Sequence, residues 1–235
     1  MLLEVADLHA GYGAMDILEG VSLALAAGEI GVVVGPNGAG KSTTLKTIFG
    51  LLRISRGTVH FEGEEITNAA PETLVGRGMS YVPQERNVFE TLTVQENLEM
   101  GCRFVPPGDR AAEIEKIYAR FPRLAERRRQ RARTLSGGER QMLAIGGALI
   151  SGPDLLILDE PVTGLSPQLC DEVVAGIAEI NRQGRTILWV VEENPQAVLG
   201  TADWVYVMEG GRVKDSTSAV ALLAAPDFRQ IFLGV

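Results

Sequence analysis

The sequence of 235 residues has little cysteine, since only Cys102 and Cys170 are present. These two residues lie far apart in the chain and in no spacing that is typical of metal ligands. We therefore expect two reduced thiols, which suits a reducing compartment such as the cytoplasm.

Long apolar segments are absent as well. The longest uninterrupted run of apolar side chains covers residues 219–225, whereas a helix that spans a bilayer needs about 20. The N-terminal residues include Glu4 and Asp7, where a secretion signal has basic residues and then an apolar stretch. We expect neither a membrane-spanning helix nor export.

Positive charge is scarce. Lys and Arg number 22 against 30 for Asp and Glu, which gives a formal net charge of −8. A protein whose whole surface binds a polyanion carries the opposite sign, so we expect no nucleic-acid partner. Hydrophobic residues make up 46% and charged residues 22%, as in an ordinary folded protein. No internal repeat occurs, which argues against solenoid architectures.

Short apolar runs rich in β-branched residues, each bounded by Gly, Pro or Asp, predict five strands. They cover residues 30–34, 79–82, 155–158, 186–191 and 204–208. Helical patterning between several of them predicts helices over 41–51, 138–150 and 169–181. Strands that alternate with helices indicate an α/β fold with a parallel sheet.

Two segments depart from this alternation within what we expect to be a single domain. Strand-like alternation predicts a small antiparallel β subdomain over about residues 1–29 and 57–66, and residues 89–150 predict a helical subdomain. The core then comprises residues 30–56, 67–88 and 151–235. An arginine-rich stretch at 126–133 is either a solvated helix end or a surface that faces a partner or a phosphate.

A glycine-rich motif lies between a predicted strand and a predicted helix. The sequence Gly35-Pro-Asn-Gly-Ala-Gly-Lys-Ser42 fits the pattern G-x-x-x-x-G-K-[ST]. In such a loop, backbone N–H groups converge on phosphate oxygens at a helix N-terminus, which favours an anion. Lys41 would reach the β- and γ-phosphates of a nucleotide, and Ser42 would hold Mg²⁺. The candidate nucleotide-binding residues are Gly35, Asn37, Gly38, Ala39, Gly40, Lys41, Ser42 and Thr43.

Two acidic residues, Asp159 and Glu160, end the apolar run 155–158. The carboxyl ends of parallel strands meet where α/β sheets bind ligands, which places both acids beside the phosphate loop. We expect Asp159 to hold Mg²⁺. Glu160 should point to the other side of the strand, where it could orient or deprotonate the attacking water.

A second candidate anion site lies at the start of another helix, in Leu135-Ser-Gly-Gly-Glu-Arg-Gln141. Ser136 is the expected N-cap, and Ser136, Gly137 and Gly138 leave backbone N–H groups free for an anion. One phosphate loop needs only one such site, so the second suggests a ligand that a partner brings. A capped helix after a turn is the plain alternative.

Together these three motifs resemble those of the ATP-binding cassette (ABC) ATPases, and residues 135–141 are similar to the signature motif of that family. The likeness covers essentially the whole chain. It implies a P-loop NTPase core of the RecA type, ATP and Mg²⁺ as cofactors, and ATP hydrolysis. It also implies dimers in which each ATP lies between the phosphate loop of one domain and the signature motif of the other.

Two further positions match this family. Tyr12 is similar to the aromatic residue that stacks on adenine, and Gln84 resembles the glutamine that reaches Mg²⁺ and faces the membrane partner. The resemblance therefore adds Gln84 to the catalytic and metal-binding candidates. It also implies that residues 85–89 and 92–103 form the groove that receives the permease.

A narrower resemblance, to the second ATPase subunit of branched-chain amino acid importers, rests on residues 121–124, 141–146, 191–194 and 221–234. It implies a motor subunit at the cytoplasmic face of the membrane, held there by permease subunits. The expected partners are a second ATPase subunit and, indirectly, a solute-binding protein. Importers of urea, amides or another small solute have similar ATPases and are the alternative for the cargo.

Three positions depart from the family pattern. Glu193 stands where most members have a histidine that contacts the γ-phosphate, so a catalytic role there needs a proton, a cation or water beside the triphosphate. Ser166 replaces an aspartate that couples the two sites, and Gly147 replaces a common arginine. We hypothesise that the partner ATPase is a different subunit and that the pair hydrolyses ATP asymmetrically, although a homodimer is the alternative.

Two rival classes of function are weighed against the transporter. An ABC ATPase that acts on nucleic acid or ribosomes usually has coiled coils, tandem cassettes or zinc modules, for which the sequence gives no sign. A nucleotide sensor that does not hydrolyse ATP stays open because of Glu193.

Overall fold

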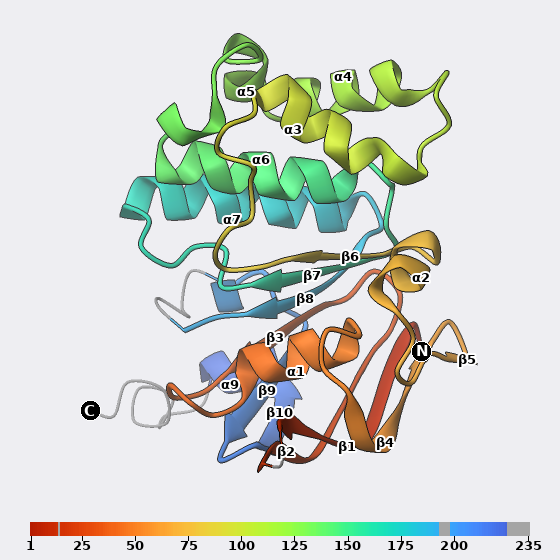
Figure 1. Ribbon diagram of the computed structural model, residues 1–235. Helices are drawn as coiled ribbons and strands as arrows, with labels where there is room; N and C mark the ends of the chain where they lie inside the picture. The colour runs from red at the N-terminus through yellow and green to blue at the C-terminus, as the bar shows by residue number, and fades with distance from the viewer. Residues whose placement is uncertain (14, 193–197, 225–235) are drawn as a thin grey trace.

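The computed structural model describes residues 1–13, 15–192 and 198–224. Figure 1 shows a central sheet with a helical part on one side, at the top of the view, and a second sheet on the other. Among the described helices, none combines the length and the apolar character that crossing a lipid bilayer requires. Glu193 lies outside the described residues.

The central sheet has six strands. In spatial order they are β10 (Arg212–Ser218), β9 (Trp204–Glu209), β3 (Ile30–Val34), β8 (Thr186–Val190), β7 (Leu155–Asp159) and β6 (Met79–Val82). Neighbours from β9 to β6 are parallel, and β10 returns antiparallel to β9. Strands β3, β7 and β8 are buried along their whole length, as apolar strands covered on both faces should be. The predicted α/β fold with a parallel sheet is confirmed.

Strand β10 is absent from the sequence prediction. Its residues, Arg-Val-Lys-Asp-Ser-Thr-Ser, include one apolar side chain, Val213, so they show no strand-like pattern. As an edge strand it needs hydrogen bonds on one side only, and β9 supplies them.

The second sheet is antiparallel, as expected for this region. Its order is β2 (Met15–Leu25), β1 (Leu3–Tyr12), β4 (Ile54–Phe61) and β5 (Glu64–Glu65). Strand β4 begins at Ile54, which pairs with Ala10, and not at the predicted residue 57. Gly57 looks like a strand boundary in the sequence, but it lies inside β4 with a φ of 96°. A Cβ at Gly57 would lie 2.3 Å from the carbonyl oxygen of Asp7, so this glycine fits an irregularity between the two strands.

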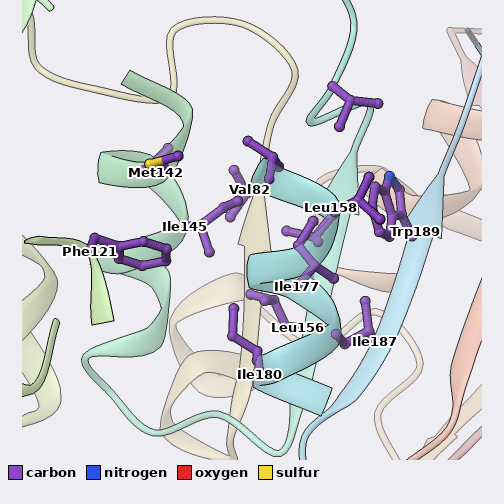
Figure 2. Close-up of a cluster of buried hydrophobic side chains, with 14 of the residues drawn as sticks. Val82, Phe121, Met142, Ile145, Leu156, Leu158, Ile177, Ile180, Ile187 and Trp189 are labelled. Carbon is purple, nitrogen blue, oxygen red and sulfur yellow. The ribbon is translucent and has the colours of Figure 1, made fainter. Parts of the chain in front are cut away.

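Helices cover both faces of the central sheet, and the sheet separates two hydrophobic cores. Helices α1 (Lys41–Ile48) and α2 (Pro71–Gly76) lie on the face towards the antiparallel sheet, where Leu45 and Leu188 are buried together. On the opposite face lies α7 (Pro167–Arg182), whose Ile177 packs in the core that contains Leu156 and Trp189 (Figure 2). Successive residues of a strand point to opposite faces, which explains how one sheet supplies both cores.

The helical part falls within the predicted residues 89–150. It contains α3 (Val94–Gly101), η1 (Cys102–Phe104), α4 (Arg110–Arg120), α5 (Pro122–Glu126), η2 (Ala132–Thr134) and α6 (Gly137–Leu149). A last short helix, α9 (Ala219–Ala224), follows β10. Both cysteines are buried and free, and burial raises the pKa of each thiol.

The arginine-rich stretch belongs partly to the helical part itself. Arg127 Nε lies 3.0 Å from Glu139 Oε1, and Arg128 Nη2 lies 2.8 Å from Glu115 Oε1. The guanidinium of Arg128 also lies 4.6 Å from the ring centre of Tyr118. For these two arginines the contacts favour the first alternative, a partly solvated helix end, because both pair with acidic residues of neighbouring helices.

The turn between β9 and β10 joins the glycine-rich loop to the antiparallel sheet. The N–H of Gly211 donates to the carbonyl of Ala39 at 3.0 Å, and the carbonyl of Gly211 accepts from the N–H of Glu19 at 2.8 Å. Gly211 has a φ of 74°, and a Cβ there would lie 2.0 Å from the carbonyl oxygen of Ile17. Only glycine fits this position without displacing its neighbours.

Candidate functional site

The glycine-rich loop leads from β3 directly into α1. Gly35 and Gly40 have φ values of 152° and 99°, and a Cβ at Gly35 would lie 2.1 Å from the carbonyl oxygen of Met208. Helix α1 begins at Lys41, so its unpaired N–H groups and partial positive charge lie at the loop. Of the other candidate residues, Ala39 and Thr43 are buried, and Asn37 and Gly38 are exposed. This geometry suits a phosphate group.

Lys41 bends back over the loop. Its Nζ donates to the carbonyl oxygens of Gly35 at 2.9 Å and of Pro36 at 3.1 Å. It also lies 3.8 Å from Glu192 Oε2, and the Lys41 side chain is only 4% exposed. The ammonium group is thus held where a phosphate on the loop would meet it.

Ser42, in the first turn of α1, contacts Asp159 at the end of β7. The Ser42 hydroxyl donates to Asp159 Oδ1 at 2.7 Å, and the Tyr81 hydroxyl donates to Asp159 Oδ2 at 2.9 Å. Burial, together with the charge of Asp159 and this hydrogen bond, raises the pKa of Tyr81. A hydroxyl and a carboxylate in contact are oxygen ligands of the kind that Mg²⁺ takes, usually together with substrate phosphates. The described residues hold no group of three or more His, Cys, Asp or Glu side chains that could bind a metal, so a Mg²⁺ ion here would take its further ligands from the nucleotide and from water.

Glu160 follows β7 and is held by two donors. Gln84 Nε2 donates to Glu160 Oε2 at 2.7 Å, and the Thr163 hydroxyl donates to the same oxygen at 3.1 Å. Burial is the main cause that raises the pKa of Glu160 to about 7, and the neighbouring Glu192 carboxyl adds to the effect. A carboxyl with a pKa near neutrality can exchange a proton with water at physiological pH.

Gln84 contacts Glu160, and the metal-binding role expected for it stays a prediction. Its amide nitrogen contacts Glu160, whereas the oxygen pair suited to Mg²⁺ is formed by Ser42 and Asp159. Two residues after the end of β6, Gln84 thus lies beside the acid predicted to act on water.

Residues 136–138 form the N-terminus of α6, as expected. Ser136 caps this helix, since its hydroxyl accepts from the N–H of Glu139 at 3.3 Å, and Glu139 Oε2 accepts from the N–H of Ser136 at 3.0 Å. Gly138 packs closely on Leu169, whose Cδ2 would lie 2.9 Å from an added Cβ. In the described part of the chain, no hydrogen bond or ion pair joins these residues to the loop at Lys41. Each candidate anion site thus lies at the start of its own helix, α6 for this one and α1 for the loop at Lys41.

A cleft of about 780 Å³ lies between the start of α6 and Glu160. Its lining includes Gln84, Gly137, Gln141, Glu160 and Thr163. The cleft therefore connects the second candidate anion site to the acidic residue.

Tyr12 ends β1 and is 51% exposed. An exposed ring at this position is available to a planar group such as a base. Tyr12 takes part in none of the hydrogen bonds described above for Lys41, Ser42, Asp159 and Glu160.

Sequence reasoning missed three side chains of the site. Tyr81 and Thr163 are hydrogen-bond donors to Asp159 and Glu160, and Glu192 lies beside Lys41. The only sequence signal was proximity to named residues, since Tyr81 lies in the predicted strand 79–82, Thr163 follows Glu160 by three residues, and Glu192 directly precedes Glu193.

Comparisons with known proteins identify the family of the chain. The sequence profile of the family described as ABC transporter matches residues 18–163. The chain is 43% identical to the high-affinity branched-chain amino acid transport ATP-binding protein BraG of Pseudomonas aeruginosa, over 95% of each chain. It is 38% identical to the probable branched-chain amino acid transport ATP-binding protein LivF of Archaeoglobus fulgidus, over 100% of this chain and 99% of that one.

Solved structures show the same fold. A nucleotide-free ATP-binding cassette from an ABC transporter superposes with a TM-score of 0.87 at 28% identity, covering 100% of this chain and 99% of that one. An ATP-binding cassette of an ABC transporter in its ADP conformation gives a TM-score of 0.85 at 28% identity, with the same coverage. Since the family profile spans more than half of the chain and the relatives align over nearly all of it, the chain belongs to the ABC transporter family as one of its ATP-binding ATPase subunits.

Proposed function

We propose that this subunit binds Mg²⁺ and ATP at the loop 35–42, hydrolyses ATP to ADP and phosphate, and thereby drives a permease that imports branched-chain or related hydrophobic amino acids. The observation that carries the chemistry is the meeting of three groups at the carboxyl ends of parallel strands. These groups are Lys41, the Ser42–Asp159 pair and the Gln84–Glu160 pair.

The loop and Lys41 bind the phosphates. Backbone N–H groups at the start of α1 hold phosphate oxygens, and Lys41 exchanges its carbonyl partners for oxygens of the β- and γ-phosphates. The exposed ring of Tyr12 stacks on adenine. Because phosphoryl transfer depends mainly on positioning and charge, these contacts contribute directly to the rate.

Ser42 and Asp159 fit a magnesium site, because their oxygens already meet at 2.7 Å. Mg²⁺ would neutralise part of the charge that develops on the phosphates. The Tyr81 hydroxyl fixes the second oxygen of Asp159, which orients the carboxylate towards Ser42.

Glu160 orients the attacking water and accepts its proton. As the water oxygen bonds to the γ-phosphorus, the bond to the bridging oxygen breaks and ADP leaves. Gln84 and Thr163 hold the Glu160 carboxyl through Oε2, so its position is fixed before the nucleotide arrives.

The start of α6 binds the ATP of a second ATPase subunit. Support comes from the presence of two such helix N-termini in one chain, at α1 and α6, where the phosphates of one nucleotide need only one. Ser166 and Gly147 stand in place of residues common in the family, so we further propose that the second subunit is a different protein. The catalytic role predicted for Glu193, at the γ-phosphate of the nucleotide on the loop 35–42, stays a prediction.

The permease docks in a groove of about 360 Å³ between α3, α6 and the segment after β6. Phe89 and Met100 line this groove and are each 55% exposed. Both lie in the segments 85–89 and 92–103 that the family resemblance assigns to the permease. Apolar side chains left exposed in a groove are typical of a protein interface. Docking there would hold the subunit at the cytoplasmic face of the membrane. A solute-binding protein would act on the subunit only indirectly, through the permease.

The cargo rests on the relatives, whose names refer to branched-chain amino acid transport. No site residue of an ATPase subunit contacts the cargo, so importers of urea, amides or another small solute are the alternative.

Reconstitution of the subunit with its permease and second ATPase tests the proposal. We expect ATP hydrolysis that is stimulated by a solute-binding protein loaded with leucine, isoleucine or valine. Stimulation by urea or amides would instead favour the alternative cargo. Stimulation by DNA or RNA without the permease would overturn the transport role.

A further inference from the structure

Glu192 stands beside the two side chains on which the proposed chemistry depends. It follows β8, which lies between β3 and β7 in the central sheet. Strand β3 leads to Lys41 and β7 leads to Glu160, so the strand order alone places Glu192 between them. The contacts agree, because Glu192 Oε2 lies 3.8 Å from Lys41 Nζ, and the Glu192 carboxyl helps to raise the pKa of Glu160.

The ammonium group of Lys41 needs a negative partner. Its side chain is only 4% exposed, and a buried charge without a partner is costly. The carbonyl oxygens of Gly35 and Pro36 accept hydrogen bonds from Nζ, but they carry no net charge. In the described part of the chain, Glu192 is the carboxylate within ion-pair distance of Lys41.

We propose that Glu192 is a positioning residue that occupies Lys41 in place of a phosphate and makes nucleotide affinity depend on the number of phosphate groups. This inference rests on the proposed role of Lys41 in phosphate binding. It assigns a function to a residue that neither the glycine-rich motif nor the acidic pair contains.

The physical basis is competition followed by repulsion. A nucleotide that reaches Lys41 must first break the pair with Glu192. The displaced carboxylate then lies near the β- and γ-phosphates, and like charges repel strongly where water is partly excluded. The repulsion between Glu192 and the nucleotide is smallest for AMP, because its single phosphate does not reach Lys41. This repulsion increases from ADP to ATP. Glu192 thus lowers affinity in proportion to the charge brought to the site.

Calorimetric titrations of wild-type and Glu192→Gln protein with AMP, ADP and β,γ-imido-ATP, all with Mg²⁺, test this directly. We expect Glu192→Gln to bind β,γ-imido-ATP about 5- to 10-fold more tightly, ADP about 2- to 3-fold more tightly, and AMP as the wild type does. A role confined to structure would change all three affinities alike. Glu192→Asp keeps the negative charge, so its affinities for the three nucleotides should follow the wild-type order.

Glu64→Gln provides a matched control. It also removes one carboxylate, in this case from an ion pair with Arg77 at 2.6 Å on the antiparallel sheet, and it changes the net charge equally. We expect its three affinities to match those of the wild type.

Two results would overturn the inference alone: equal changes for all three nucleotides in Glu192→Gln, or weaker binding of β,γ-imido-ATP. A crystal structure of the wild-type protein with this nucleotide gives a test that needs no variant. There we expect Lys41 Nζ on a phosphate oxygen and Glu192 beyond ion-pair distance, and a persistent Lys41–Glu192 pair would contradict the inference. Failure of the wild type to bind any nucleotide would overturn the proposed function as well.

Discussion

At Glu160 both the backbone and the side chain are constrained. The residue has a φ of 50°, a conformation that is uncommon for residues other than glycine. Its N–H donates to the carbonyl of Val190 at 3.1 Å, while Gln84 and Thr163 hold its carboxyl. Strained backbone persists only where the surroundings fix it, and it costs of order 1 to 3 kcal/mol. The protein therefore holds this carboxyl in place at the expense of some stability.

Replacing the carboxyl by an amide should separate binding from catalysis. We expect Glu160→Gln to bind ATP, while its turnover falls about 10²- to 10⁴-fold, the usual effect of losing a general base. Phosphate release measures turnover, and calorimetry measures binding. Unchanged turnover would exclude Glu160 as the base.

The pH dependence of hydrolysis should report the same group. Because burial raises the pKa of Glu160 to about 7, the carboxylate that accepts a proton forms only as pH rises through this value. We expect kcat/KM, which reflects the free enzyme, to rise about tenfold between roughly pH 6 and pH 8. A profile that is flat over this range would show that Glu160 is already ionised at the lower pH.

The residues of the candidate site differ in how far the sequence could predict them. Lys41, Ser42, Asp159 and Glu160 lie in short motifs whose strand and helix context the sequence also indicates. Thr163 lies only three residues after Glu160, so its hydrogen bond to that residue is local. Tyr81 and Glu192 are ordinary residues in sequence, and they join the site only because parallel strands bring distant chain segments to one edge. Side-chain contacts of this kind depend on strand order, which local patterns do not specify.

At the scale of single elements, the N-terminus of α6 is both a capped helix end and a candidate anion site. Ser136 and Glu139 form a capping box that satisfies backbone N–H groups of the helix. Arg127 lies 3.0 Å from Glu139, so it offsets a negative charge close to the second candidate anion site. The same hydroxyl and backbone groups are proposed to contact the ATP of the partner.

A comparison of two cap variants should separate these two roles. We expect Ser136→Ala to lower the free energy of unfolding by about 1 kcal/mol, and also to reduce the ATPase activity of the assembled pair. Thr93 caps α3 through an equivalent box with Glu96, so Thr93→Ala should cost similar stability without affecting hydrolysis when no permease is present. Urea unfolding and phosphate release measure the two effects. Equal activities in the two variants would remove Ser136 from the nucleotide site.

The ends of elements were harder to predict than their presence. The predicted helix 41–51 ends at Ile48 in the structure, before Gly50 with its φ of 70°. Strand β4 continues through Gly57 because a partner strand accommodates the irregularity, and β10 exists because β9 offers a free edge. In both strands, pairing with a neighbour decides the structure and the local residue pattern does not.

At the scale of the whole molecule, one hydrophobic core joins the helical part to the central sheet. Figure 2 shows Phe121, Met142 and Ile145 close to Ile177 of α7, with Leu156 of the sheet beyond. Helix α7 thus lies between the helical part, which carries residues 136–138, and the central sheet, whose strands β3 and β7 lead to Lys41 and Glu160 (Figure 1). Loosening this core should affect both at once.

A cavity in this core should destabilise the molecule. Ile177 is fully buried, with 0% exposure, so Ile177→Ala should lower the free energy of unfolding by about 2 to 5 kcal/mol. Val220 is 79% exposed, and Val220→Ala should change stability by no more than about 0.5 kcal/mol. Urea unfolding measures both. A loss below about 1 kcal/mol at Ile177 would show that the core readily collapses around the deletion.

The fold class followed from the alternation of strands and helices, but the arrangement of the parts did not. The sequence predicted antiparallel and helical segments in addition to a parallel sheet, without showing on which side of the sheet each lies or how they touch. The link through Gly211 is an example, because a glycine in a turn has no pattern that names Ala39 and Glu19 as its partners.

That link has a consequence for inherited variation. In Gly211→Ala, the added Cβ would collide with Ile17 and would also weaken the hydrogen bond to Ala39. A subunit with an intact glycine-rich motif could therefore still bind ATP less tightly. The capacity to bind nucleotide is thus encoded at two distant places in the gene. A survey of variants restricted to the motif itself would overlook one of them.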